Sequence, residues 1–170
     1  KLVTTTLIQT YLNFLHNLTF YNPNTFNPYK SVAIESVELR NSKLSNAEDL
    51  EIKLIIQSKI SIKIGIETII RDDNYSPISY SSTQPMQNIV LQLEKGTNII
   101  NFIIADLRLA VGSYVFEIRL IDPWKEEFDY VTNISFEVVI SDPFNTGFSF
   151  LKSYNRGHTF NKLILSDRND

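Results

Sequence analysis

The chain of 170 residues has no cysteine, one tryptophan and only five glycines. Without cysteine it can form no disulfide framework, no thiolate zinc site and no cysteine nucleophile. This suits a reducing compartment, although many extracellular β-domains also lack cysteine. The glycines at 65, 96, 112, 147 and 157 stand too far apart for a Walker loop or a dinucleotide-binding fingerprint. We therefore expect no nucleotide binding.

The motifs of common hydrolases are also missing. No H-E-x-x-H and no G-x-S-x-G occurs, and the two histidines, His16 and His158, are isolated in the sequence. The acidic pair at 72–73 is followed by Asn74 and is typical of a turn rather than of a calcium site. The acidic residues at 126–129 could imitate a glycosidase carboxylate pair, but charges that flank a strand are far commoner. We predict no enzyme activity, no cofactor and no metal.

Charge and hydropathy give no support to a nucleic-acid-binding or a membrane-spanning protein. A formal net charge of −3 gives no electrostatic reason to expect nucleic acid or an anionic membrane as a partner. The apolar stretches at 52–70 and 99–111 are interrupted by charged residues, so neither is expected to span a bilayer. No signal-peptide pattern is present, and the first residue is Lys1 rather than methionine, which leads us to expect a fragment of a larger protein.

What is abundant favours strands. Isoleucine is the commonest residue, alanine is rare and aromatic residues make up 12% of the chain. From residue 32 onward, apolar and polar residues alternate at period two in short segments separated by turns. The predicted strands are 32–39, 50–57, 60–71, 78–83, 89–93, 98–104, 112–122 and 128–140. This pattern predicts an all-β protein, an immunoglobulin-like or jelly-roll antiparallel β-sandwich.

The most regular strand follows Gly112 and ends at Asp122-Pro123, because proline cannot donate to the ladder. The alternation predicts which strand residues fill the core, namely Leu54, Ile64, Tyr114, Phe116, Ile118, Phe136 and Val138. Gly65 indicates a bulge or a close backbone approach, and the pair Ile69-Ile70 predicts a register shift near Thr68. The aromatic residues after Pro143 are expected to pack, either on their own sandwich or on a partner.

The N-terminal segment differs from the rest. Apolar residues at helical spacing predict a short helix over 5–18, followed by a turn-rich connector at 22–28. We divide the chain into residues 1–30, a helix and linker, and residues 31–170, the β-sandwich domain. The helix could be an appendage packed on the sandwich or the tail of an upstream domain.

Several segments, in this order, resemble the C-terminal domain of Wzt, the ATP-binding subunit of ABC transporters that export bacterial O-antigen polysaccharides. The similarity covers about 31–150 and is carried by 32–39, 46–54, Gly65-Ile66, 71–73, 81–83, 107–114, 120–122 and 136–138. Ala110-Val111 departs from the commoner Leu-Pro before the glycine, and the stretch 68–70 is one residue longer than the usual pattern.

The resemblance implies a non-catalytic domain that binds the non-reducing end of a finished polysaccharide and so gates its export. It also implies a homodimer, in some members through exchange of the C-terminal strand. The other implied partners are an upstream ATPase domain and the membrane subunit of the transporter. The implied location is cytoplasmic, peripheral to the inner membrane.

The resemblance supplies no motif for ligand residues, so the candidate site comes from strand geometry. Side chains that face away from the core on the strands from 112 and 128, with two aromatic residues at nearby strand ends, could hold sugars. They are Tyr80, Glu117, Arg119, Trp124, Asn133, Ser135 and Glu137. Two other classes stay open: an extracellular immunoglobulin-like structural or adhesion module, and a capsid-type jelly roll.

Overall fold

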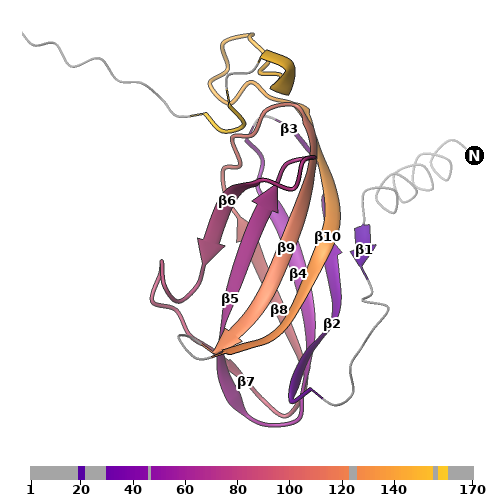
Figure 1. Ribbon diagram of the computed structural model, residues 1–170, viewed down its shortest axis with the longest axis vertical. Coiled ribbons are helices and arrows are strands. Elements are labelled where there is room, and N and C mark those ends of the chain that lie inside the picture. The colour runs from indigo at the N-terminus through magenta and orange to yellow at the C-terminus, as the bar shows by residue number, and fades with distance from the viewer. Residues whose placement is uncertain (1–18, 22–29, 46, 123–125, 155–156, 161–170) are drawn as a thin grey trace, which may run out of the picture.

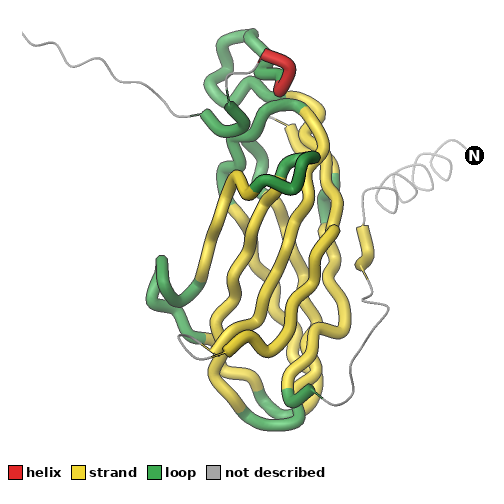
Figure 2. Tube along the Cα trace, in the orientation of Figure 1, coloured by secondary structure: helices red, strands yellow, loops and turns green. Residues whose placement is uncertain are grey.

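A computed structural model describes residues 19–21, 30–45, 47–122, 126–154 and 157–160, and two β-sheets pack face to face in it (Figures 1 and 2). The predicted helix at 5–18, most of the linker and Trp124 lie outside the described residues. The small sheet has the strand order β1-β2-β4-β8. Its strands are β1 (Thr19–Tyr21), β2 (Val32–Leu39), β4 (Leu50–Ser58) and β8 (Gly96–Ile104).

The large sheet has the order β3-β10-β9-β5-β6, and β7 also pairs with β5. Its strands are β3 (Lys43–Ser45), β5 (Ile62–Arg71), β6 (Pro77–Ser82), β7 (Leu91–Leu93), β9 (Gly112–Asp122) and β10 (Glu126–Ile140), and a 3-10 turn η1 (Lys152–Tyr154) follows. The all-β sandwich is therefore confirmed. One detail differs from the prediction, since β3 pairs with β10 in parallel while the other described pairs are antiparallel.

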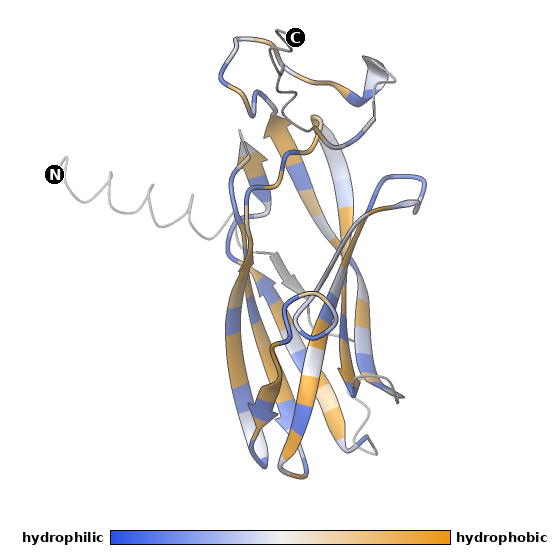
Figure 3. Cartoon of the chain, turned by 90° about the vertical axis from the view of Figure 1, so that its left-hand side faces the viewer, coloured by the Kyte–Doolittle hydropathy of each residue, from blue (hydrophilic) through white to orange (hydrophobic). Residues whose placement is uncertain are grey.

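The core lies between the sheets and follows the period-two pattern of the sequence. Hydrophilic and hydrophobic residues alternate along the strands in Figure 3. In β9, Tyr114, Phe116 and Ile118 are at most 1% exposed, and Phe136 and Val138 on the neighbouring strand β10 are buried as well. The other predicted core residues, Leu54 and Ile64, are also fully buried. All the predicted core residues are thus confirmed.

Tyr114 closes the corner that leads into β9. Its hydroxyl donates to the carbonyl oxygen of Ala110 at 2.7 Å, the geometry of the tyrosine corner found in many β-sandwiches. Its ring stacks on Phe136 at 5.5 Å between centroids, and the Lys152 ammonium lies 4.0 Å from the ring centroid. Glycine suits position 112, because its positive φ of 153° is a conformation that residues with a side chain rarely adopt.

The aromatic residues after Pro143 form a cluster at one end of their own sandwich. Phe150 is central, with ring centroids 4.1 Å from Phe160, 5.1 Å from Phe148 and 6.4 Å from Phe144. The backbone N–H of Phe150 donates to the carbonyl oxygen of Ser141, and that of Val111 donates to the carbonyl oxygen of Phe150. The described part of this segment therefore packs against its own sandwich.

Strand β5 corrects one prediction and refines another. Its register with β9 runs without interruption from Gly65 to Arg71, so the predicted shift near Thr68 is wrong. Ile69 simply faces outward and is half-buried there, while Ile70 faces the core. Gly65 marks a close approach rather than a bulge, since a Cβ would lie 3.2 Å from Ile121 Cγ1.

Candidate functional site

The outward side of the large sheet carries a continuous set of polar side chains. The strand registers place Tyr130, Arg119 and Glu67 in one row across β10, β9 and β5. The next row contains Glu117 on β9, Ile69 on β5 and Tyr80 on β6. We call this surface the polar face and define it by Glu67, Arg71, Tyr80, Glu117, Arg119, Glu127 and Tyr130.

Glu117 is the centre of the polar face. Its side chain is only 5% exposed, because two arginines cover it. Its carboxylate accepts hydrogen bonds from Arg71 Nε at 3.0 Å and from Arg119 Nε at 2.7 Å, and Arg119 Nη2 also contacts it. Burial alone would raise the pKa of Glu117, but the bonds from Arg119 and Arg71 outweigh burial and lower it. Glu117 therefore stays ionised and holds both guanidinium groups in place.

The network extends outward from Arg119. Its Nη1 lies 3.4 Å from Glu127 Oε2, so this guanidinium contacts two carboxylates. On β6, the Tyr80 hydroxyl donates to Glu67 Oε1 at 2.7 Å. The pKa of Tyr80 is raised by partial burial and by this bond to Glu67. Because the charged groups hold one another, the surface is ordered before any ligand arrives.

Two exposed tyrosines flank this network. Tyr80 is 45% exposed and Tyr130 is 53% exposed. Tyrosine combines an apolar ring with a polar hydroxyl, and the neighbouring carboxylates and guanidinium groups are strong hydrogen-bonding partners for hydroxyl groups. A flat, hydroxyl-rich ligand such as a sugar ring fits this combination.

A hollow with a volume of about 470 Å³ lies beside the polar face on the same sheet. The predicted residues Ser135 and Glu137 line it, together with Lys43 and the exposed Tyr75. Lys43 Nζ lies 3.9 Å from Glu137 Oε2. Val115 connects the hollow with the polar face, since it pairs with Ser135 on one side and with Arg71 of β5 on the other.

The sequence-based candidates thus fall into groups. Tyr80, Glu117 and Arg119 lie together in the polar face, although Glu117 is buried rather than solvated. Ser135 and Glu137 lie in the adjoining hollow. Asn133 is exposed in an irregular part of β10 and has a positive φ of 64°. Trp124 is outside the described residues, and the role of every candidate as a ligand residue remains a prediction.

Sequence reasoning did not predict Glu67, Arg71, Glu127 and Tyr130 as site residues, although they complete the polar face. It also missed Tyr75 in the hollow. The alternation of β5 was visible in the sequence. Glu67 and Arg71 are four residues apart, and such residues of one strand face the same side of the sheet. Their role depends on β5 being the neighbour of β9. The order of strands in a sheet is not encoded in the period-two pattern, so this pairing needed the structure.

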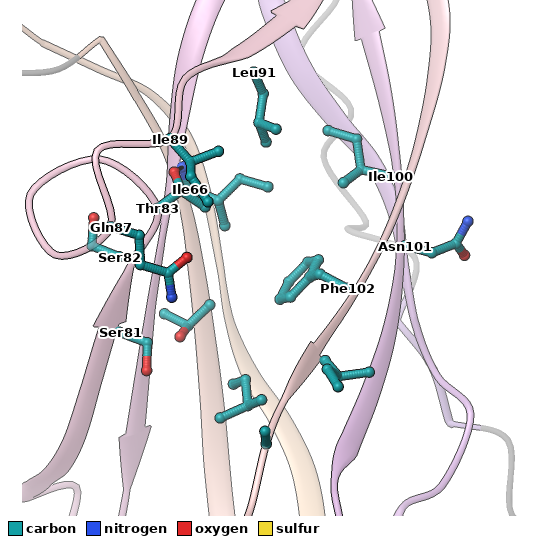
Figure 4. Close-up of a pocket in the computed structure, with 14 residues that line it drawn as sticks. Ile66, Ser81, Ser82, Thr83, Gln87, Ile89, Leu91, Ile100, Asn101 and Phe102 are labelled. Atoms are coloured by element: carbon teal, nitrogen blue, oxygen red, sulfur yellow. Dashed lines mark hydrogen bonds between the residues drawn. The ribbon is translucent and has the colours of Figure 1, made fainter.

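A cleft of about 500 Å³ opens between the two sheets along one side of the sandwich (Figure 4). Ile66 of the large sheet and Ile100 and Phe102 of the small sheet point into it, and Ser81, Thr83 and Gln87 form part of its rim. Among the described residues, those that line this cleft carry no charge. It therefore differs from the polar face in both position and chemistry.

The described residues contain no group of three or more His, Cys, Asp or Glu side chains placed to hold a metal ion. Among the same residues, no helix is long and apolar enough to cross a membrane.

Comparison with known proteins identifies the architecture. No protein-family model matches the chain, and no curated protein sequence is similar to it. Among solved structures, the C-terminal domain of Wzt is similar over 88% of this chain and 87% of that chain, with 11% identity and a TM-score of 0.55. The chain shares the β-sandwich fold of that domain.

Parts of larger enzymes also match. A glycosyl hydrolase family 2 member from Bacteroides cellulosilyticus is similar over 63% of this chain but only 15% of its own, with 16% identity and a TM-score of 0.46. For a β-glucuronidase from Parabacteroides merdae the shares are 64% and 14%, with 19% identity and a TM-score of 0.41. The chain therefore spans about a seventh of these enzymes.

Proposed function

We propose that this chain is a non-catalytic carbohydrate-binding domain that recognises the non-reducing end of a bacterial O-antigen-type polysaccharide and so gates its export by an ABC transporter. The observation that carries the proposal is the polar face. There a fixed Glu117–Arg119–Arg71 network lies between two exposed tyrosines, on a sandwich with the fold of the Wzt C-terminal domain.

The polar face suits a sugar for physical reasons. Carboxylates accept hydrogen bonds from sugar hydroxyls, and guanidinium groups donate to them, so both ring oxygens and hydroxyl hydrogens find partners. Tyr80 and Tyr130 offer apolar ring surface to the C–H groups of the sugar. An exposed sheet surface also leaves room for the rest of a long polymer, which an enclosed pocket would exclude.

The wider context follows from the resemblance of the sequence to the Wzt family. In this proposal the domain is joined to an upstream ATPase domain and works beside the membrane subunit of the transporter, at the cytoplasmic side of the inner membrane. It acts as a homodimer, which presents the polar face twice and increases avidity for a long chain.

Binding to immobilised bacterial O-polysaccharides, measured by calorimetry or interferometry, tests the proposal. Tyr80→Ala and Tyr130→Ala should each weaken binding about tenfold, equivalent to ~1.4 kcal/mol, if the rings stack on the sugar. Arg119→Ala and Asn133→Ala should abolish it. Lys95→Ala, in the exposed turn before β8, is the matched control and should bind like the parent chain.

Each variant needs a circular dichroism spectrum, because Arg119 also stabilises Glu117. A folded Arg119→Ala variant that binds like the parent would move the site away from the polar face, to the inter-sheet cleft, the loops or the small sheet. Unchanged binding of Asn133→Ala would remove that residue from the predicted site. Failure of the parent chain to bind any member of a broad polysaccharide panel would favour the structural-module alternative.

A further inference from the structure

Strand β8 is a long sheet edge that lacks the features by which proteins usually protect such edges. Of the described strands, only β4 pairs with it, over nine consecutive residues without a bulge. Its sequence, Gly-Thr-Asn-Ile-Ile-Asn-Phe-Ile-Ile, has no charged residue and no proline. An edge strand that is long, regular and uncharged is a template for pairing with another strand.

The other described edges differ from β8. Strand β6 begins with Pro77 and its register shifts near that end. Strands β1 and β3 are each three residues long, and the register of β3 is also irregular. Because these edges are short or interrupted, the free edge of β8 is the outstanding pairing site in the described part of the chain.

The side chains of β8 also favour a partner. On the outward side, Ile99 is 59% exposed and Ile103 is 56% exposed. On the inward side, Ile100 and Phe102 are only partly buried and line the open inter-sheet cleft, while Asn101 points the other way (Figure 4). Ile89, which also lines the cleft, is 46% exposed. Apolar surface is therefore concentrated along this side of the sandwich.

We propose that the free edge of β8 pairs antiparallel with β8 of a second copy of this chain, with Asn101 on the two-fold axis, so that the small sheets of two copies form one continuous sheet. In this register Ile99 faces the partner's Ile103, and Ile100 faces the partner's Phe102. Apolar residues thus oppose apolar residues on both sides of the sheet. Arg40, which donates to Asn101 Oδ1 at 3.2 Å, lies near the axis, and Glu51 lies 3.9 Å from its guanidinium group.

The self-complementary sequence argues for a second copy rather than a different protein. A two-fold contact requires one surface to match itself. The segment 99–103, Ile-Ile-Asn-Phe-Ile, has apolar residues on both sides of the central asparagine, so it presents the same pattern when it is read in either direction. The added strand also satisfies the free backbone groups of the edge. This interface is separate from the polar face, which lies on the other sheet, and does not rest on the proposed carbohydrate function.

The absence of cysteine allows a direct test by oxidative cross-linking. Residues directly opposite in an antiparallel pair have Cα atoms about 4.5–5.5 Å apart, within the range that a disulfide bridges. Asn101→Cys should therefore give a covalent dimer in high yield on mild oxidation. Thr97→Cys is the matched control on the same exposed side, because its two copies would lie roughly 27 Å apart at about 3.4 Å per residue.

A second measurement uses charge. In sedimentation, the parent chain should exceed the monomer mass of 19.6 kDa, and the Ile99→Lys/Ile103→Lys variant should be a monomer with the circular dichroism spectrum of the parent. Ile60→Lys, at a site that is 45% exposed in a turn, should leave the dimer intact.

The proposal fails if the parent chain is monomeric at every concentration, or if Thr97→Cys cross-links as well as Asn101→Cys. It also fails if the dimer survives the double lysine substitution. Loss of that dimer on removal of 161–170 would then assign the contact to the C-terminal segment.

Discussion

Tyr114→Phe removes a single hydroxyl group from the corner before β9 and should destabilise the fold measurably. The hydroxyl donates to the carbonyl oxygen of Ala110 at 2.7 Å, and both residues are at most 1% exposed. Phenylalanine keeps the ring stacked on Phe136 and beneath the Lys152 ammonium. The change therefore leaves a buried carbonyl without this donor, which costs about 1–3 kcal/mol.

Urea denaturation followed by circular dichroism measures this cost. For a loss of about 2 kcal/mol and a slope of ~2 kcal/mol per molar urea, the midpoint falls by roughly 1 M while the slope is unchanged. Tyr130→Phe is the matched control, because its side chain is 53% exposed and a surface change of this kind should stay within about 0.5 kcal/mol. Equal midpoints for the two variants would refute a stabilising role for the Tyr114 bond.

The same tyrosine predicts an alkaline effect. Burial, together with the nearby charges of Asp73 and Asp72, raises the pKa of Tyr114 above its ordinary value of 10.0. The unfolded chain then loses this proton first, so stability falls as the pH rises above about 10. The loss should be smaller in Tyr114→Phe, and parallel pH profiles for the parent and the variant would contradict the assigned shift.

Two further substitutions test the network and the core. Glu117→Gln should cost about 1–3 kcal/mol at neutral pH, because the two arginines lose a charged acceptor. The pKa of Glu117 is below its ordinary value of 4.5, so its contribution to the free energy of unfolding is present above pH 4.5 and is lost as the pH falls further. Denaturation at a series of acid pH values should therefore show a smaller loss of stability in the variant than in the parent chain. Ile118→Ala should cost about 2–5 kcal/mol in thermal or urea unfolding, since the side chain is fully buried and leaves a cavity. A cost below about 1 kcal/mol would mean that the two sheets are not packed over Ile118 as described.

The fold could be predicted from sequence because burial on one side of each strand imposes period two. In β9, Tyr114, Phe116 and Ile118 alternate with exposed or partly exposed positions, and the structure buries all three. The exception is Glu117, which the pattern assigns to solvent. It is buried because Arg71, from a neighbouring strand, and Arg119 cover it. Such cover depends on strand order, which the pattern does not contain.

Shifts in the pairing register of the strands were harder to predict from sequence. The pair Ile69-Ile70 suggested a shift, yet the ladder between β5 and β9 is regular. Ile69 tolerates its outward position because it is half-buried between Glu117 and Tyr80 on the neighbouring strands. The pairing of β9 with β10 is irregular instead, between Glu127 and Asp129 and between Val131 and Ile134, where no glycine or proline marks the shift. Strand β3 was missed because three residues are too few to show a period.

The central claim is that the polar face binds carbohydrate, and a titration followed by nuclear magnetic resonance tests it most directly. Backbone amide shifts of the isotope-labelled chain would be recorded while a bacterial O-polysaccharide fragment that binds is added. The account predicts saturable shifts on β5, β6, β9 and β10, centred on Glu67, Tyr80, Arg119 and Tyr130, with β4 and β8 unaffected. Shifts confined to the cleft around Ile100 and Phe102, or to the small sheet, would contradict it.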